Sequence, residues 1–339
     1  MRKFWLVAGM MLWLSQVNAQ QKPHYTQYLL NQYIINPALT GIENYSDIRI
    51  SHRHQWTGIT DAPVTSYITA HTAIGKQDYR TTATSFSIEG ENPRGRAYWE
   101  DYTAAEPHHG VGIQVINDET GPISNFSAYL TYAYHLGISA RTSLSGGFGV
   151  GMNRINLNAS KLQFYNLSVD PAVYSSNNIR RVKPDLMAGL YLYSANYFVG
   201  VSAQQILPQR IDFSNNQVKV DDSRLIPHLF ATAGYRFLAG ENFNITPSVL
   251  VKYINHTPTQ VDINTKVQFR DFAWVGVGYR VEEGFNGMLG INVAKKVSLS
   301  YAYDYTSSGL NNYTTGTHEV VIGFMLGNGY SDSCPRNVW

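Results

Sequence analysis

The chain has 339 residues, with 26 basic and 24 acidic side chains, and only 15% of its residues are charged. This near-neutral balance excludes the strong positive charge by which proteins neutralise nucleic-acid phosphates. The single cysteine, Cys334, excludes an internal disulfide framework. Many Tyr (24) and Gly (28) residues with few charges are typical of a transmembrane β-barrel, although they also fit a secreted β-sandwich.

Residues 1–19 have the pattern of a secretory signal peptide. Arg2 and Lys3 form a basic start, residues 4–14 are apolar, and small residues precede a predicted cleavage after Ala19. The apolar run is too short for a membrane anchor, which needs roughly 20 apolar residues. Loss of this peptide would leave 24 acidic residues and an equal number of basic ones.

Residues 20–45 precede the first predicted strand and include the stretch NQYIINPALTG at 31–41. The Asn36-Pro37 step favours extended backbone, and Gly41 permits a tight turn into the first strand. Apolar side chains between 29 and 35 need burial and have helical spacing, which allows one short helix. We predict that this segment runs along the periplasmic rim or fills the barrel lumen as a plug. A floppy leader is the alternative.

Residues 46–327 alternate between apolar and polar side chains in segments of about 10 residues, as in the wall of a membrane barrel. In 261–270 (VDINTKVQFR), one face carries Val, Ile and Phe, whereas the other carries Asp, Asn, Lys, Gln and Arg. A soluble sandwich would instead carry Lys and Glu on its outward face. The alternation predicts fourteen strands, near 46–57, 63–74, 109–118, 123–136, 142–154, 183–194, 197–206, 225–238, 242–255, 259–269, 271–281, 286–294, 297–306 and 316–327.

We therefore predict an all-β protein: a single transmembrane antiparallel β-barrel of about 14 strands, with a short N-terminal periplasmic segment and a periplasmic tail at 328–339. Short connections fall on the side where the first strand begins, and the long linkers 155–182, 207–224 and 307–315 fall on the other. Short periplasmic turns and longer outer loops are usual. This predicts an outer-membrane location with both termini in the periplasm. The long segment 75–108 is either an insertion there or an extra hairpin around 82–90.

Side chains on the two faces of the strands have different predicted roles. Aromatic residues near strand ends suit the girdles at the membrane interfaces: Trp56, Tyr132, Tyr134, Tyr253, Trp274, Tyr279, Tyr301, Tyr303 and Tyr305. Polar residues on the opposite face should point into the lumen: Arg49, Arg53, Gln55, Asp262, Lys266, Arg280, Asp304 and Glu319. Because the first and last strands meet when the barrel closes, Arg53 and Glu319 should be neighbours. A structural salt-bridge network is favoured over a selectivity filter.

No sequence pattern selects a catalytic, cofactor or metal site. The run GFGVG at 147–151 lies inside an alternating strand, where glycines let strands bend or make room in the lumen. His52 and His54 share one face, but no nearby Cys or carboxylate completes a metal-ligand set. We expect no enzyme activity, although an outer-membrane enzyme is kept as a third class of function.

Ordered short motifs resemble the PorP/SprF family of the Bacteroidetes. The N-terminal signature matches at 25–28 and at Asn36-Pro37-Ala38 with Gly41, and further matches lie at 53–58, 62–65, 301–304, 318–319 and 334–336. The chain departs from the family at the insertion 76–108 and in its last three residues. The matching residues chosen as family or structural sites are Asn36, Pro37, Ala38, Gly41, Arg53, Gln55, Trp56, Pro63, Tyr303, Asp304, His318 and Glu319.

The resemblance implies an outer-membrane component of the type IX secretion and gliding machinery that exports or anchors a secreted surface protein or adhesin. We expect partner contacts from aromatic residues of the long outer loops: Tyr165, Tyr174, Phe213 and Tyr313. Segments 20–45, 75–108 and 328–339 would face periplasmic secretion components, and the barrel wall would face the lipid bilayer. The alternative function is a porin or a transporter of small solutes or lipid.

Overall fold

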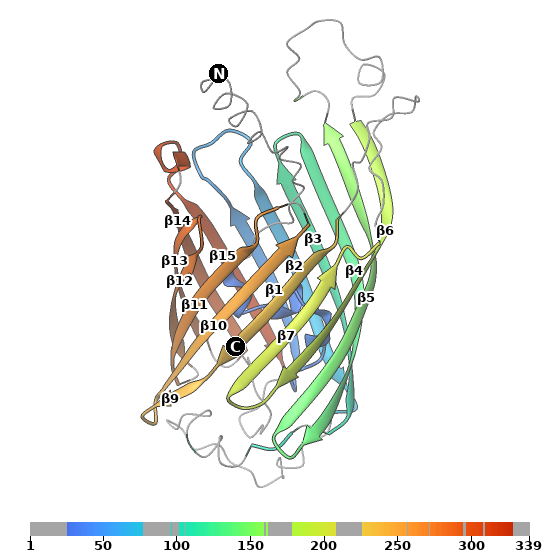
Figure 1. Ribbon diagram of the computed structural model, residues 1–339, viewed down its shortest axis with the longest axis vertical. Coiled ribbons are helices and arrows are strands. Elements are labelled where there is room, and N and C mark those ends of the chain that lie inside the picture. Colours follow the sequence, from blue (N-terminus) through green and yellow to red (C-terminus); the bar gives the residue numbers. More distant parts are fainter. Residues whose placement is uncertain are drawn as a thin grey trace, which may run out of the picture.

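A computed structural model shows a tall barrel of tilted strands (Figure 1). It describes residues 26–76, 96, 102–104, 106–158, 161, 178–207, 226–255, 257–270, 272–293, 296–307 and 309–327. The predicted signal peptide, most of the segment 75–108 and the tail 328–339 lie outside these residues. In the described part of the chain, no helix has the length and apolar character needed to cross a membrane.

The wall consists of strands that pair in antiparallel order around the barrel. The first eight are β1 Ser46–His54, β2 Val64–Ile74, β3 His108–Thr120, β4 Ile123–Ser139, β5 Thr142–Asn158, β6 Asn178–Tyr193, β7 Tyr197–Gln204 and β8 His228–Tyr235. The others are β9 Phe237–Ala239, β10 Phe243–Ile254, β11 Gln260–Phe269, β12 Ala273–Arg280, β13 Gly284–Val293, β14 Val297–Thr306 and β15 Thr317–Leu326.

The barrel has fourteen wall positions because β8 and β9 are two parts of one strand. Both pair with β10, and only Arg236 separates them. The Arg236 backbone N–H donates to the carbonyl oxygen of Asn196 at 2.7 Å, so it bonds outside the β10 ladder. Pairing of β1 with β15 closes the ring. The predicted all-β, fourteen-stranded barrel is therefore confirmed.

Strand pairs β4–β5 and β5–β6 extend further than the sequence indicated. The linker predicted at 155–182 is shorter, because residues 155–158 and 178–182 continue the β5–β6 ladder up to the pair Asn158–Asn178. The alternation of inward and outward side chains persists through these residues, with Ile155 buried and Arg154 half-buried. Because most of these residues are polar, the sequence did not show this alternation. The β5–β6 pairing therefore extends beyond the end of β7 at the loop end, whereas β5 and β4 end at nearly the same level.

The two ends of the barrel differ. We name the end where β1 finishes the loop end, and the end where β1 begins the turn end; the loop end is uppermost in Figure 1. Turns at 140–141, 194–196, 240–242, 270–272 and 294–296 lie at the turn end, whereas connections 159–177 and 205–227 lie at the loop end. The short connections are thus gathered at one end and the long ones at the other. The assignment of the turn end to the periplasm rests on this difference in length.

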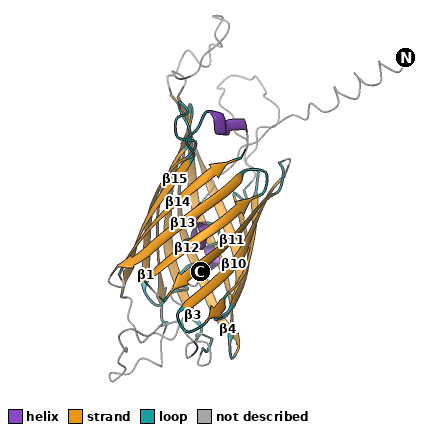
Figure 2. Ribbon diagram, turned by 90° about the vertical axis from the view of Figure 1, so that its left-hand side faces the viewer, coloured by secondary structure: helices purple, strands orange, loops and turns teal. Residues whose placement is uncertain are grey.

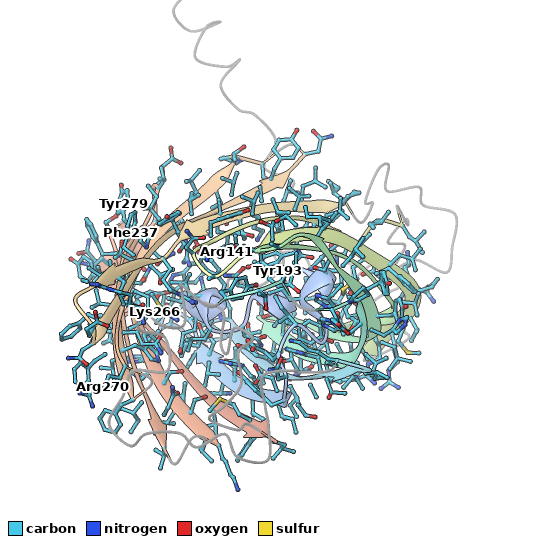
Figure 3. All side chains as sticks on the ribbon, turned by 90° about the horizontal axis from the view of Figure 1, so that it is seen from below. Arg141, Tyr193, Phe237, Lys266, Arg270 and Tyr279 are labelled. Atoms are coloured by element: carbon cyan, nitrogen blue, oxygen red, sulfur yellow. The ribbon has the colours of Figure 1, made fainter. Side chains whose placement is uncertain are left out.

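Side chains alternate between an apolar outer surface and a polar lumen. In β13, Phe285, Leu289 and Ile291 are exposed, whereas Asn286, Met288 and Gly290 are buried. Figure 3 looks along the barrel and shows Phe237 and Tyr279 on the outside and Lys266 inside the ring. One girdle residue was predicted on the wrong face. Trp274 points inward and joins the buried core with Met288, because the inward face of β12 has glycines that leave room for it.

Residues 26–45 lie inside the barrel, and we name Thr26–Tyr45 the luminal segment (Figure 2). It forms three 3-10 helices instead of one short helix: η1 Thr26–Leu29, η2 Gln32–Ile34 and η3 Pro37–Leu39. Every residue in it is buried except Leu30 and Asn44, which are half-buried. A fourth 3-10 helix, η5 Gly309–Asn312, lies in the β14–β15 loop.

The luminal segment runs from the loop end to the turn end. The Thr26 backbone N–H donates to a Glu319 carboxylate oxygen at 3.0 Å, close to the start of β15. At the other end, Tyr45 leads directly into β1, whose first residue pairs with Leu326. The described chain therefore begins near one end of the barrel and finishes at the other, while the termini themselves lie outside the described residues.

The apolar outer surface predicts a position-dependent cost of adding charge. Leu130 lies in the middle of β4 with 64% of its surface exposed, so Leu130→Arg should lower the free energy of unfolding by about 2–4 kcal/mol. Ser124→Arg on the same strand and face, near the loop end, should cost only about 0–1 kcal/mol. Urea unfolding in lipid vesicles measures both. Equal costs would contradict the assignment of this face to the membrane.

Candidate functional site: a filled lumen

Asn36 fixes the centre of the luminal segment. Its side-chain oxygen accepts a hydrogen bond from the Ala38 backbone N–H at 2.9 Å, which caps η3. Its amide nitrogen donates to the carbonyl oxygens of Leu190 and Val201, at 3.1 and 3.3 Å. Pro37 occupies the first position of η3, where its missing N–H costs nothing. The Asn-Pro pair thus both starts a turn and ties it to β6 and β7.

The Thr40–Gly41 backbone is held by three buried histidines. The ring nitrogen Nε2 of His135 lies 2.8 Å from the Thr40 carbonyl oxygen, and Nε2 of His108 lies 3.2 Å from the Gly41 carbonyl oxygen. The Gly41 N–H donates to Nδ1 of His71 at 3.1 Å. These contacts satisfy backbone groups that burial would otherwise leave without water, at a cost of about 1–3 kcal/mol each.

The histidines themselves are held in place. His108 and His135 stack with ring centroids 4.5 Å apart and nearly parallel planes. Nδ1 of His135 lies 3.0 Å from the Tyr193 hydroxyl, which orients the ring. Tyr193 points into the ring of strands when the barrel is viewed from the turn end (Figure 3).

Gly41 and Gly147 each have a separate structural requirement. Gly41 has a φ of +74°, and a Cβ there would lie 2.5 Å from the Gly110 Cα, so no larger residue fits this turn. Gly147 on β5 faces η3, and a Cβ there would lie 2.5 Å from the Pro37 carbonyl oxygen and 2.7 Å from the Ala38 Cα. The glycines of 147–151 thus include one that makes room for the luminal segment.

Apolar residues of the luminal segment pack against the inward faces of distant strands. Tyr28, Leu29 and Ile34 belong to a buried cluster that also includes Phe230, Leu250, Trp274 and Met288. The Tyr33 hydroxyl lies 2.6 Å from the Thr131 hydroxyl. Because side chains of several strands of the wall bury these residues, the segment is packed like a domain core.

A charged network holds the first residue of the luminal segment. Arg53 contacts a Glu319 carboxylate oxygen at 3.1 Å and an Asp304 carboxylate oxygen at 2.8 Å. The Thr26 hydroxyl donates to Asp304 at 2.6 Å and also accepts a hydrogen bond from Arg53. Arg53 and Glu319 are 3% and 1% exposed, so a buried ion pair links β1 to β15 at the closing seam.

The network continues along the neighbouring strands. Nε of Arg280 donates to Asp262 at 2.9 Å, and Nη1 donates to Glu283 at 3.2 Å. Arg49 pairs with Asp47 at 2.9 Å on the inward face of β1. The predicted luminal polar residues are thus inward and buried, except for Gln55, which lies in the connection after β1.

The remaining family-motif residues lie at the loop end or on the outer surface. The Gln55 N–H donates to the Pro63 carbonyl oxygen at 2.9 Å, and the Trp56 N–H donates to the Thr317 hydroxyl at 3.1 Å. Tyr303 and His318 face outward with ring centroids 5.3 Å apart. The motif residues therefore divide among the luminal segment, the charged network, a loop and the outer face.

The predicted partner-binding residues fall in two groups. Tyr313 lies in the β14–β15 loop with 75% of its surface exposed. The other three, Tyr165, Tyr174 and Phe213, lie outside the described residues.

Sequence reasoning missed the roles of His71, His108 and His135. Each lies on the inward face of an adjacent strand, β2, β3 or β4, so strand alternation could have placed them in the lumen. Nothing in the sequence identified the backbone that they bind. Within the described residues, no group of three or more His, Cys, Asp or Glu side chains could hold a metal ion.

A closed β-barrel with an apolar outer surface and a polar, filled lumen is an outer-membrane barrel protein. A family model described as type IX secretion system membrane protein PorP/SprF matches residues 17–324. The chain belongs to this family, as its motifs indicated, and the family is not one of enzymes.

Solved structures that are similar to this chain have little sequence in common with it. The Ralstonia pickettii toluene transporter TbuX is 8% identical, with a TM-score of 0.50 over 86% of this chain and 92% of its own. The Acinetobacter baumannii outer membrane protein Omp33 is 11% identical, with a TM-score of 0.44 over 84% of this chain and all of its own. No curated protein matches the chain.

Gly147→Ala should loosen the luminal segment. The added Cβ collides with η3 backbone, and overpacking costs about 1–3 kcal/mol, so amide exchange in residues 31–42 should rise roughly ten- to hundredfold. Gly146→Ala is the matched control, because a Cβ there meets only a Leu190 methyl group at 3.5 Å. Hydrogen–deuterium exchange of the reconstituted protein measures both. A similar rise in both variants would show that the strand, not the contact, is responsible.

Arg53→Met should destabilise the barrel by about 3–5 kcal/mol, because it leaves the buried Glu319 carboxylate without its cation and leaves Asp304 only the longer contact with Arg280, at 3.7 Å. Lys161→Met removes the exposed ion pair with Asp61 and should cost about 0–1 kcal/mol. The free energy of unfolding in urea distinguishes the two. A cost below about 1 kcal/mol for Arg53→Met would contradict the structural importance of the network.

Proposed function

We propose that this protein is a non-enzymatic barrel that exports or anchors a secreted surface protein or adhesin at its loop end and links it to periplasmic secretion or gliding machinery at its turn end. The observation that carries this proposal is the filled lumen. Thr26–Tyr45 occupies the interior from one end to the other and packs there as a core, which disfavours a free diffusion pore. Partners would therefore bind at the two exposed ends of the barrel, the loop end and the turn end.

The loop end provides a firm surface for a partner. The Thr57 N–H donates to the Gly316 carbonyl oxygen, and the Thr315 N–H donates back to Thr57, both at 2.8 Å. Asp61 accepts from the Gly121 N–H at 3.0 Å through its backbone. Three connections far apart in sequence therefore form one hydrogen-bonded platform beside Tyr313. An exposed aromatic side chain on a rigid platform suits an interface anchor.

The turn end provides a second surface. A cavity of about 580 Å³ opens there and is lined by Arg96, Tyr102, Arg141, Ser194, Ala195, Asn196 and Leu238. Its volume is within the range of binding pockets, roughly 300–1,000 Å³. In the proposed orientation, this end and the 328–339 tail face the periplasm. The periplasmic partner would bind there.

Affinity purification of the tagged protein from native outer membranes in mild detergent tests the docking. We expect a large secreted protein in near-equal amount, as identified by mass spectrometry. Tyr313→Ala should reduce its recovery at least about tenfold, as loss of an aromatic anchor worth about 2 kcal/mol would do. Tyr279→Ala, on the membrane-facing surface, is the matched control. Recovery of the barrel alone from native membranes would reject stable docking.

Planar-bilayer conductance tests the alternative of a porin. The intact protein should not give steady ion conductance, because the luminal segment fills the interior. Removal of residues 20–41 should open a conducting lumen, and heat-modifiable gel mobility verifies that the shortened barrel still folds. Steady conductance of the intact protein would favour transport of small solutes.

A further inference from the structure

The outer face of strands β3 to β6 forms regular rows across the wall. The strand register aligns Ile113, Leu130, Val150 and Leu186 in one row, and Val115, Ala128, Met152 and Pro184 in the next row toward the loop end. These rows are apolar, and Leu130 and Met152 are among their well-exposed members. They therefore mark the part of this wall that faces lipid tails.

Two arginines appear on this face where the apolar rows end. Arg154 follows Met152 by two residues, so it points outward from β5. Arg180 points outward from the neighbouring β6 and is exposed. Arg154 is paired with Val182 and Asn156 with Arg180, so the two arginines are diagonal neighbours on one surface.

An aromatic ring supports the first guanidinium. The Arg154 guanidinium carbon lies 5.1 Å from the centre of the Phe126 ring, and the two residues are directly paired across β4 and β5. A cation over an aromatic face within about 6 Å is attracted to it and restrained in position. The nitrogen atoms that point away from the ring remain available to a ligand.

Among the described residues, the nearby acidic side chain on this face does not neutralise the pair. Glu119 shares the row of Arg180, but Ser124 and Asn156 lie between them. It is three strands away, roughly 14 Å at the usual strand spacing. It also accepts a hydrogen bond from Asn117 at 3.1 Å.

On the opposite wall, strands β12 to β14 carry different outward residues at the loop end. There the register aligns Tyr279, Phe285 and Tyr305 in one outward row, with the first two ring centroids 4.9 Å apart. An aromatic row is the usual anchor at a membrane interface and selects no charged headgroup. The arginine pair is therefore a local feature of the β5–β6 hairpin.

We infer that Arg154 and Arg180 form a binding site for the phosphate of a lipid A-type glycolipid in the membrane leaflet at the loop end. Guanidinium groups bind phosphate oxygens by paired hydrogen bonds, and the level of these two residues is that of headgroups. The apolar surface of Met152 and Val182 directly below would receive an acyl chain. This site requires nothing of the docking function proposed above.

Native mass spectrometry of the detergent-solubilised protein, titrated with phosphorylated lipid A, tests the inference. We expect a saturable one-to-one adduct that fails to form with enzymatically dephosphorylated lipid A. The double variant Arg154→Gln/Arg180→Gln should weaken it about thirtyfold, from roughly a fivefold effect of each arginine near a membrane surface. Phosphatidylglycerol should bind more weakly than lipid A.

Arg270→Gln is the matched control, because Arg270 also lies over an aromatic ring, that of Phe269, at 5.4 Å, but at the turn end. It should leave the adduct unchanged. Unaltered binding by the double variant, equal binding of the dephosphorylated lipid, or an equal loss in Arg270→Gln would overturn the site. Equal affinity for phosphatidylglycerol would overturn the assignment to a glycolipid.

Discussion

The burial of the luminal segment is the constraint on which the rest of the structure depends. A chain that enters a barrel brings backbone N–H and C=O groups away from bulk water, and each must find a partner. Here the wall supplies them: His71, His108 and His135 bind the Thr40–Gly41 turn. The lumen is therefore polar for a reason other than conduction, because its side chains complete the hydrogen bonding of the segment inside.

The same constraint explains the charged network at the seam. Arg53 joins β1 to Glu319 on β15 and Asp304 on β14, and all three groups surround Thr26. A buried pair of this kind adds little net stability over apolar packing, but loss of one member is costly. We expect its contribution to be specificity, because the strands must close in one register for Thr26 to be held.

Strand alternation was sufficient to predict the wall, whereas the contents of the lumen required contacts that no local pattern encodes. Strand positions, inward charges and the Arg53–Glu319 contact all follow from a period of two and from closure of the ring. The histidine contacts do not, because the Thr40–His135 hydrogen bond joins residues 95 positions apart. Trp274 was misplaced because aromatic residues suit both an interface girdle and a core, and its room depends on neighbouring glycines.

The luminal segment also connects the two ends of the molecule. Thr26 contacts the charged network through Glu319. Close to this network, at the loop end, the Trp56 backbone N–H donates to the Thr317 hydroxyl. Gly41 touches the first residue of β3, at the turn end. A partner at the loop end could influence the turn end only if it bound two arrangements of this path with different affinities. The segment is thus a packed path that joins the two surfaces through the interior of the barrel.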